Sequence, residues 1–172
     1  RMIDFARKGR GTCRPLGKPG FSLKREWLND GQRRAVSHVL YSPDRVMLLR
    51  GRAGTGKTTL MQEAVEAIEA NGTRAVTFAP SADASRGTLR NEGFENAETV
   101  ARLLADKELQ SEVQGQVIWI DEAGLLGVRT MAQVFDLADK TGARVILSGD
   151  RFQHGSVERG AALRLLEQDA GL

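Results

Sequence analysis

A glycine-rich run between two apolar segments constrains this chain more than any other feature. Residues 51–58 read GRAGTGKT and fit the pattern GxxxxGK(S/T). The apolar run Val46–Leu49 comes directly before it, and a helical apolar stripe starts at Leu60 directly after it. In a strand–loop–helix arrangement of this kind, backbone N–H groups and a helix N-terminus converge on phosphate oxygens. The run therefore predicts a phosphate-binding loop rather than a chance glycine-rich turn.

The residues of this loop suit a nucleoside triphosphate with Mg²⁺. Glycines let the backbone turn tightly and approach the anion, Lys57 reaches the β- and γ-phosphates, and the Thr58 hydroxyl ligates Mg²⁺. The residues expected to bind the nucleotide are Gly51, Gly54, Thr55, Gly56, Lys57, Thr58 and Thr59.

Composition indicates a soluble globular protein. The chain has 172 residues, 41% of them hydrophobic and 27% charged, which suits one domain with its own core. No apolar stretch approaches the roughly 20 residues that span a membrane, and the polar start is no secretory signal. The single cysteine, Cys13, favours a reducing, cytoplasmic location. Because the first residue is Arg1 rather than Met, we expect a segment of a longer protein.

Basic charge is concentrated at the start of the chain. Residues 1–34 carry ten Lys/Arg and three Asp/Glu, a balance of +7, whereas the rest carries 15 basic and 19 acidic groups, a balance of −4. The Gly/Pro-rich stretch 8–20 lacks periodicity, so we interpret residues 1–24 as a basic arm or linker before a lobe over 25–172. Such an arm suggests contact with a polyanion, and a solvated, partly disordered leader is the alternative.

Strands and helices alternate along the rest of the chain. The pattern predicts strands over 46–50, 75–79, 117–120 and 144–147, and helices over 29–40, 56–70, 81–90, 99–105, 128–139 and 161–168. Continuous apolar strands are typical of a sheet that is covered on both faces. The fold class is therefore α/β, with a central parallel sheet between helical layers.

Two acids follow the third of these strands. Asp121 and Glu122 end the run VIWIDE, at the carboxyl edge of the sheet where ligands bind in such folds. Asp121 would hold Mg²⁺ together with Thr58, and Glu122 would activate the attacking water as a general base. A solvated pair of loop acids is the alternative. Trp119, within the strand, is interpreted as a core residue.

A third loop leaves the same edge after the last predicted strand, where residues 147–153 read LSGDRFQ. Gln153 could report the state of the γ-phosphate, because an amide both donates and accepts hydrogen bonds. Gly149-Asp150 alone is a good turn pair, but as the third motif at one edge it indicates a nucleotide-sensing loop.

Together these motifs resemble those of superfamily 1 helicases in order and spacing. GRAGTGKTT, VIWIDEAG and LSGDRFQ resemble motifs I, II and III, and FAPSADAS and TVARLL resemble the DNA-facing motifs Ia and Ib. Gln32 holds the place of the family's adenine-reading glutamine, although it also fits a capping role after Asn29. Trp27 could pack as a hydrophobic staple or lean on the nucleotide base.

A more specific resemblance is to the helicase region of conjugative relaxases of the TraI/TrwC (MobF) type, in the RecD-like branch. It covers residues from about 25 to 170, and DEAGLLGVRTM and GARVILSGDRFQHGSVERGAALRLLE carry it. The resemblance implies a three-layer RecA-like P-loop NTPase lobe that binds ATP and Mg²⁺, the first motor lobe of a 5′→3′ single-stranded DNA translocase. It also implies DNA contacts at Pro80, Ser81, Thr99 and Arg102. A plain N-cap at Thr99 and a solvated Arg102 are the alternatives.

The resemblance implies that other parts of the motor protein lie outside these 172 residues. One such part is the second RecA-like lobe with its arginine finger, so we expect the isolated chain to hydrolyse ATP poorly. The partners we expect are that lobe and single-stranded DNA, with no membrane and a monomeric state. A relaxase nuclease needs a tyrosine nucleophile and a histidine metal cluster, and this sequence has only Tyr41, His38 and His154. We therefore expect no nicking activity.

Two other functions fit parts of the pattern. One is a catalytically silent nucleic-acid-binding module, and the other is a small-molecule kinase that shares the phosphate loop. The intact Lys57, Asp121 and Glu122 argue against the silent module, and the Gly-Asp-x-x-Gln loop favours a translocating NTPase over a kinase.

Overall fold

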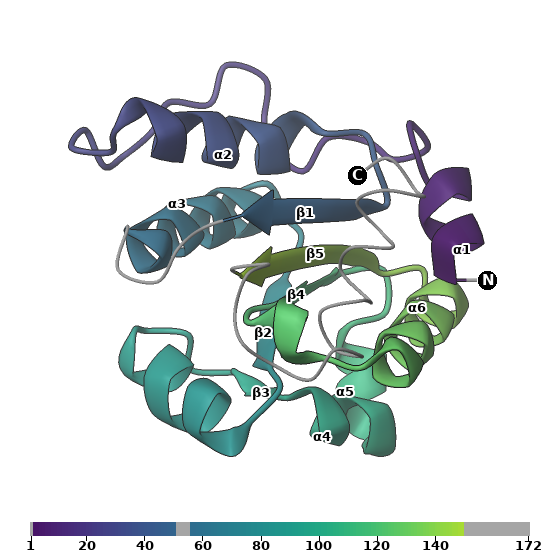
Figure 1. Ribbon diagram of the computed structural model, residues 1–172. Coiled ribbons are helices and arrows are strands. Elements are labelled where there is room, and N and C mark those ends of the chain that lie inside the picture. Colours follow the sequence, from purple (N-terminus) through teal and green to yellow (C-terminus); the bar gives the residue numbers. More distant parts are fainter. Residues whose placement is uncertain (1, 51–55, 150–172) are drawn as a thin grey trace.

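Five parallel strands form the central sheet of the computed structural model, which describes residues 2–50 and 56–149 (Figure 1). The strands are β1 (Val46–Arg50), β2 (Ala75–Ala79), β3 (Glu98–Thr99), β4 (Val117–Ile120) and β5 (Arg144–Gly149). Their order across the sheet is β1-β5-β4-β2-β3, and every pair is parallel. Because β5 lies between β1 and β4, the carboxyl ends of these three strands lie side by side at the same edge of the sheet.

Helices cover both faces of the sheet. They are α1 (Met2–Lys8), α2 (Asp30–Tyr41), α3 (Lys57–Ala70), α4 (Val100–Ala105), α5 (Lys107–Glu112) and α6 (Val128–Thr141), with a π-helix η1 (Asp83–Leu89) and a 3₁₀ turn η2 (Ala123–Leu125). In Figure 1, α2 and α3 lie over one face, and α4, α5 and α6 lie over the other with α1 beside α6. This confirms the predicted α/β fold with three layers.

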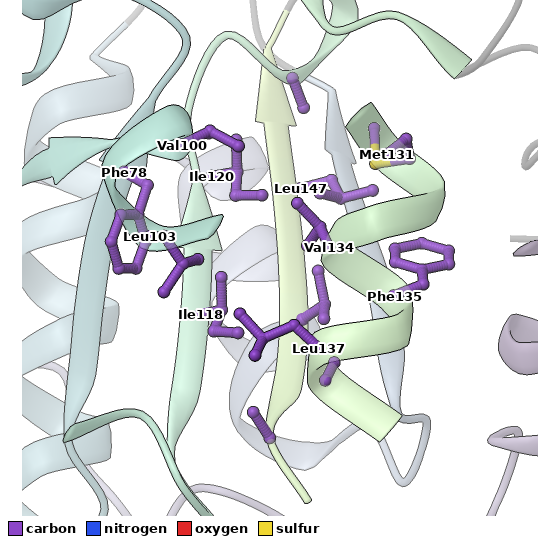
Figure 2. Packing of buried hydrophobic residues seen from close by; sticks show 14 of the residues in the cluster. Phe78, Val100, Leu103, Ile118, Ile120, Met131, Val134, Phe135, Leu137 and Leu147 are labelled. Carbon is purple, nitrogen blue, oxygen red and sulfur yellow. The ribbon is translucent and has the colours of Figure 1, made fainter. Parts of the chain in front are cut away.

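Alternate residues of the central strands supply two separate cores. Ile118 and Ile120 of β4 pack toward α6, where Figure 2 shows them facing Val134 and Leu137. Trp119, the residue between those two isoleucines, belongs to the opposite core under α2 and α3. Each fully buried side chain of this size contributes about 1.5–3 kcal/mol relative to an exposed one. The continuous apolar run at 117–120 therefore serves both faces at once, as its pattern predicts.

Most predicted elements are confirmed, and several differ in detail. The strands over 46–50, 75–79 and 117–120 match, and β5 extends to Gly149. The expected helix over 81–90 is a π-helix over Asp83–Leu89. The short strand β3 and the helices α1 and α5 were not predicted, since each is brief. The predicted helix over 161–168 lies outside the described residues.

Several residues before 25 contact the rest of the described chain. Leu16 is buried, and the Arg144 guanidinium donates to the carbonyl oxygens of Arg14, Ser42 and Asp44 at 2.6–2.8 Å. The fully buried Glu63 of α3 accepts from the backbone N–H groups of Lys24 and Arg25 at 3.2 and 2.8 Å. Gly and Pro content alone does not reveal such long-range contacts. The boundary between an arm over 1–24 and a lobe over 25–172 stays a prediction.

None of the described helices is both long enough and apolar enough to cross a membrane.

Candidate nucleotide-binding site

Side chains from two strand ends meet at the carboxyl edge of the sheet. Lys57 is the first residue of α3, just beyond the loop that follows β1, and Asp121 and Glu122 directly follow β4. The Lys57 Nζ atom lies 3.1 Å from Asp121 Oδ1 and 3.0 Å from Glu122 Oε1. The structure thus brings together the lysine and both acids of the predicted site across the intervening strand β5.

The charges in this cluster favour a protonated lysine. Burial by itself lowers the pKa of Lys57, but the attraction and hydrogen bonds of Asp121 and Glu122 outweigh it and raise the pKa above its ordinary value. Glu122 uses Oε1 for the lysine, whereas its Oε2 is buried with no hydrogen-bond partner among the described residues. One cation therefore balances two acids, and one carboxylate oxygen is left without a donor from the described part of the chain.

The backbone around Glu122 is unusual and closely packed. Glu122 adopts a left-handed conformation with φ of 56°, a region that costs a non-glycine residue energy and is common at functional sites. Gly149, at the end of β5, has φ of 144°, and a Cβ atom there would come 3.3 Å from Glu122 Cα. A glycine at 149 therefore lets the end of β5 pass directly beside the second acid.

A buried chain of hydrogen bonds supports Asp121 from below. The Trp119 indole N–H donates to Ser148 Oγ at 2.9 Å, and the Ser148 hydroxyl donates to Asp121 Oδ1 at 3.0 Å. Trp119 is a core residue, as predicted. Because a buried indole N–H needs an acceptor, its Nε1–H also takes part in this chain of hydrogen bonds. Sequence reasoning missed this role of Ser148, whose only sign is a serine that ends an apolar strand.

Replacing Ser148 by alanine should destabilise the chain by about 1–3 kcal/mol, because the buried Trp119 N–H loses its acceptor. Urea denaturation measures this change. Ser111→Ala is the matched control, since the Ser111 hydroxyl is exposed and bonds only the carbonyl of Lys107, and it should stay within about 0.5 kcal/mol of wild type. Equal stability of the two variants would contradict the supporting role.

Gln32 fulfils the capping role that was one of its two interpretations. Its backbone N–H donates to Asn29 Oδ1, and the Asn29 N–H donates to Gln32 Oε1, both at 2.8 Å. The amide nitrogen of the same side chain donates to the Gly56 carbonyl at 3.1 Å. Gly56 is left-handed with φ of 79°, and a Cβ there would collide with Gln32 Nε2. Gln32 therefore lies against the last residue before α3, and adenine reading stays a prediction.

The oxygen ligands predicted for Mg²⁺ are chemically suitable. The Thr58 hydroxyl and the Asp121 carboxylate are hard oxygen donors, which Mg²⁺ takes together with phosphate oxygens and water. In this structure the Thr58 hydroxyl donates to Glu92 Oε2 at 2.5 Å, a contact that the sequence did not predict. Among the described residues, no three His, Cys, Asp or Glu side chains gather to form a metal site of their own. A magnesium ion here would therefore depend on the nucleotide for further ligands.

The residues predicted to contact DNA separate into two pairs. Pro80 and Ser81 line a pocket of about 620 Å³ that reaches Glu122 on one side and Gln133 of α6 on the other. Thr99 instead caps α4, because its hydroxyl accepts from the Arg102 N–H at 3.0 Å. The exposed Arg102 side chain donates to Asp106 at 3.0 Å. The alternatives considered for Thr99 and Arg102 are thus observed, and they leave the DNA contacts untested.

Some predicted site residues cannot be placed. Gly51, Gly54, Thr55 and Gln153 lie outside the described residues. Thr59 lies in the first turn of α3. Trp27 is 74% exposed, so the prediction that it packs as a hydrophobic staple is wrong, and the buried residue next to the Asn29 cap is Leu28.

Comparison with known proteins points to the same kind of lobe. Residues 27–171 match the family described as AAA domain. The chain is 34% identical over 166 residues to the conjugal transfer protein TraA of Rhizobium radiobacter, which covers 96% of this chain and 15% of that protein. It is 31% identical over 170 residues to the multifunctional conjugation protein TraI of Escherichia coli strain K12, covering 92% and 10%. The chain thus spans a small part of these relatives.

Two further similarities extend this picture. The RecBCD enzyme subunit RecD of Mycobacterium tuberculosis strain CDC 1551 is 32% identical over 179 residues, covering 87% of this chain and 31% of that protein. The crystal structure of Bacteroides sp. Pif1 in complex with ADP-AlF4 superposes with a TM-score of 0.56 at 18% identity, over 83% of this chain and 36% of that one, and it supports the fold. The chain therefore belongs to the AAA domain family, in the RecD-like branch of superfamily 1 helicases that is related to conjugative relaxases.

Proposed function

We propose that this chain is the ATP-binding first motor lobe of an ATP-dependent single-stranded DNA translocase or helicase. The observation that carries the proposal is the position of Lys57 Nζ, between Asp121 and Glu122 at 3.1 and 3.0 Å, at the carboxyl edge of a parallel sheet. Nucleotides bind at this edge in open α/β sheets. A cation held by two acids beside a helix N-terminus matches what a triphosphate with its metal requires.

Each residue of the cluster has a proposed part in hydrolysis. Lys57 would leave its carboxylate partners to neutralise the β- and γ-phosphates. Thr58 and Asp121 would hold Mg²⁺, which would stabilise the charge that develops on the phosphoryl oxygens. Glu122 takes a proton from the attacking water, with its unpartnered Oε2 available for that contact. Gln32 reads the adenine edge, and Gln153 senses the γ-phosphate.

We propose that single-stranded DNA crosses the surface beside this site. The pocket lined by Pro80 and Ser81 includes Glu122, so a strand seated there would lie next to the proposed catalytic acid. Thr99 and Arg102 extend this surface along α4, although Arg102 would first have to leave Asp106. Contacts of this kind hold a strand by phosphate and sugar and carry no sequence preference.

The parent protein is part of the same proposal. Since the similar conjugation proteins are several times longer than this chain, we infer a conjugative relaxase–helicase in which a second lobe supplies an arginine to the shared nucleotide site. We also propose 5′→3′ movement and a monomeric, cytoplasmic protein, on the sequence resemblance and the single Cys13.

The test is phosphate release from ATP, with and without single-stranded DNA, by this chain and by a longer protein that includes it. We expect nucleotide binding but slow turnover by the chain alone, because an arginine finger contributes about 10³–10⁵ in rate in comparable systems. DNA should stimulate the longer protein. Turnover above about 10 s⁻¹ by the chain alone would contradict the proposal that a second lobe must supply an arginine for fast hydrolysis.

The products and the nucleotide dependence separate the alternatives. A phosphorylated acceptor in place of free phosphate would indicate a kinase. DNA binding without any bound nucleotide or hydrolysis would indicate a silent nucleic-acid-binding module.

A further inference from the structure

Glu92 makes the shortest polar contact at the nucleotide edge and has no role in the mechanism described so far. It lies in the turn that follows η1, 34 residues after Thr58, and its Oε2 accepts the Thr58 hydroxyl at 2.5 Å. A hydroxyl–carboxylate bond of this length is a charge-assisted hydrogen bond, about twice as strong as a neutral one. The Thr58 proton is therefore directed at Glu92.

The turn that carries Glu92 is fastened to α3 at a second point. The Gln62 side-chain amide donates to the Glu92 carbonyl at 2.8 Å. Residues 58 and 62 are one helical turn apart on the same face of α3, so both contacts come from one stripe of the helix. On the other side, the Glu92 N–H donates to the carbonyl groups of Thr88 and Leu89 at 3.0 and 3.1 Å. The position of the carboxylate is thus fixed by the helix before it and the helix beside it.

A threonine hydroxyl that ligates a metal must point its oxygen lone pairs at the ion and its proton elsewhere. An acceptor that takes the proton fixes this orientation and increases the electron density on the oxygen, as outer-shell partners do for metal ligands generally. A carboxylate also adds negative charge close to the cation. Glu92 supplies the acceptor and the charge together.

We propose that Glu92 is a positioning residue that prepares Thr58 to bind Mg²⁺ with the nucleotide. This inference rests on the proposed function, since it requires Thr58 to be a magnesium ligand. The turn after η1 would then affect how tightly the chain binds the metal–nucleotide complex. Glu92 acts through Thr58 and does not touch the reacting atoms.

The test compares the affinity for a fluorescent ADP analogue in Mg²⁺ with the affinity in EDTA, for wild type, Glu92→Gln and Glu95→Gln. Wild type should bind more tightly in Mg²⁺. Glu92→Gln should lose about 10-fold or more of this gain, the range found for outer-shell partners of metal ligands, with its affinity in EDTA unchanged. Glu95 is an exposed acid in the same turn, and its replacement should leave the gain intact. In a Thr58→Ala background, Glu92→Gln should have a smaller effect than in wild type, because only the charge of the carboxylate then remains to be lost.

Three results would overturn the inference. They are an unchanged magnesium gain in Glu92→Gln, an equal loss in Mg²⁺ and in EDTA, and a loss in the Thr58→Ala background as large as the loss in wild type. If Glu92→Gln does not fold, Gln62→Ala gives the answer, because it keeps the carboxylate but removes the second anchor and should reduce the gain in Mg²⁺ alone. A wild-type chain that binds no nucleotide would overturn the proposed function itself, which separates that failure from this one.

Discussion

Replacing Glu122 by glutamine should slow ATP hydrolysis by about 10²–10⁴-fold, the contribution of a general base, while nucleotide binding is retained. Glutamine keeps the shape of the side chain, and its oxygen can still accept from Lys57 Nζ, which lies 3.0 Å from Glu122 Oε1. What is lost is the second, buried carboxylate oxygen as a proton acceptor. A single-turnover assay with enzyme in excess over radiolabelled ATP measures the chemical step even when steady-state turnover is slow.

Glu112→Gln is the matched control for this experiment. Glu112 is an exposed acid at the end of α5, remote from the sheet edge, and its replacement should leave the rate unchanged. A Glu122→Gln chain that hydrolyses ATP at the rate of the control would exclude Glu122 as the base. Loss of nucleotide binding together with hydrolysis would instead assign Glu122 to binding.

Replacing Lys57 by methionine should weaken nucleotide binding by about 10- to 100-fold, because a hydrogen bond to a charged group contributes about 1.5–3 kcal/mol. Methionine approximates the length of the lysine stem without its charge. In the free chain the change also leaves Asp121 and Glu122 without the cation that bonds both of them. The same fluorescent ADP analogue, titrated in Mg²⁺, measures the affinity.

Lys140→Met controls for the loss of a lysine as such, since Lys140 is exposed in the last turn of α6. Circular dichroism establishes that both variants are folded before binding is compared. Nucleotide affinity that survives in folded Lys57→Met would mean that the loop after β1 does not hold the phosphates.

Local patterns were enough to predict most of the sheet and the central acids. The strands at 75–79 and 117–120 are short apolar runs between turn residues, and the Asn29–Gln32 capping box depends on two residues three positions apart. That Lys57 meets Asp121 follows from chain topology, because the carboxyl ends of β1 and β4, two parallel strands separated by β5, lie at the same edge of the sheet. These features need only the sequence around each site and the rule for parallel sheets.

The side-chain contacts that escaped prediction depend on residues far apart in the sequence. Glu92 reaches Thr58 across 34 residues, and nothing in the sequence around either residue indicates the pairing. The composition of the segment before residue 25 indicates a linker, yet Lys24 donates to the buried Glu63 and Arg14 accepts from the buried Arg144. The Trp119–Ser148–Asp121 chain joins neighbouring strands, and it becomes visible only when their register is known.

The most direct test of the central claim is a structure of this chain with a non-hydrolysable ATP analogue and Mg²⁺. We predict that Lys57 Nζ moves from Asp121 and Glu122 to the β- and γ-phosphates, and that Thr58 and Asp121 take part in holding the ion. An analogue bound elsewhere, with both Lys57 ion pairs still closed, would contradict the account.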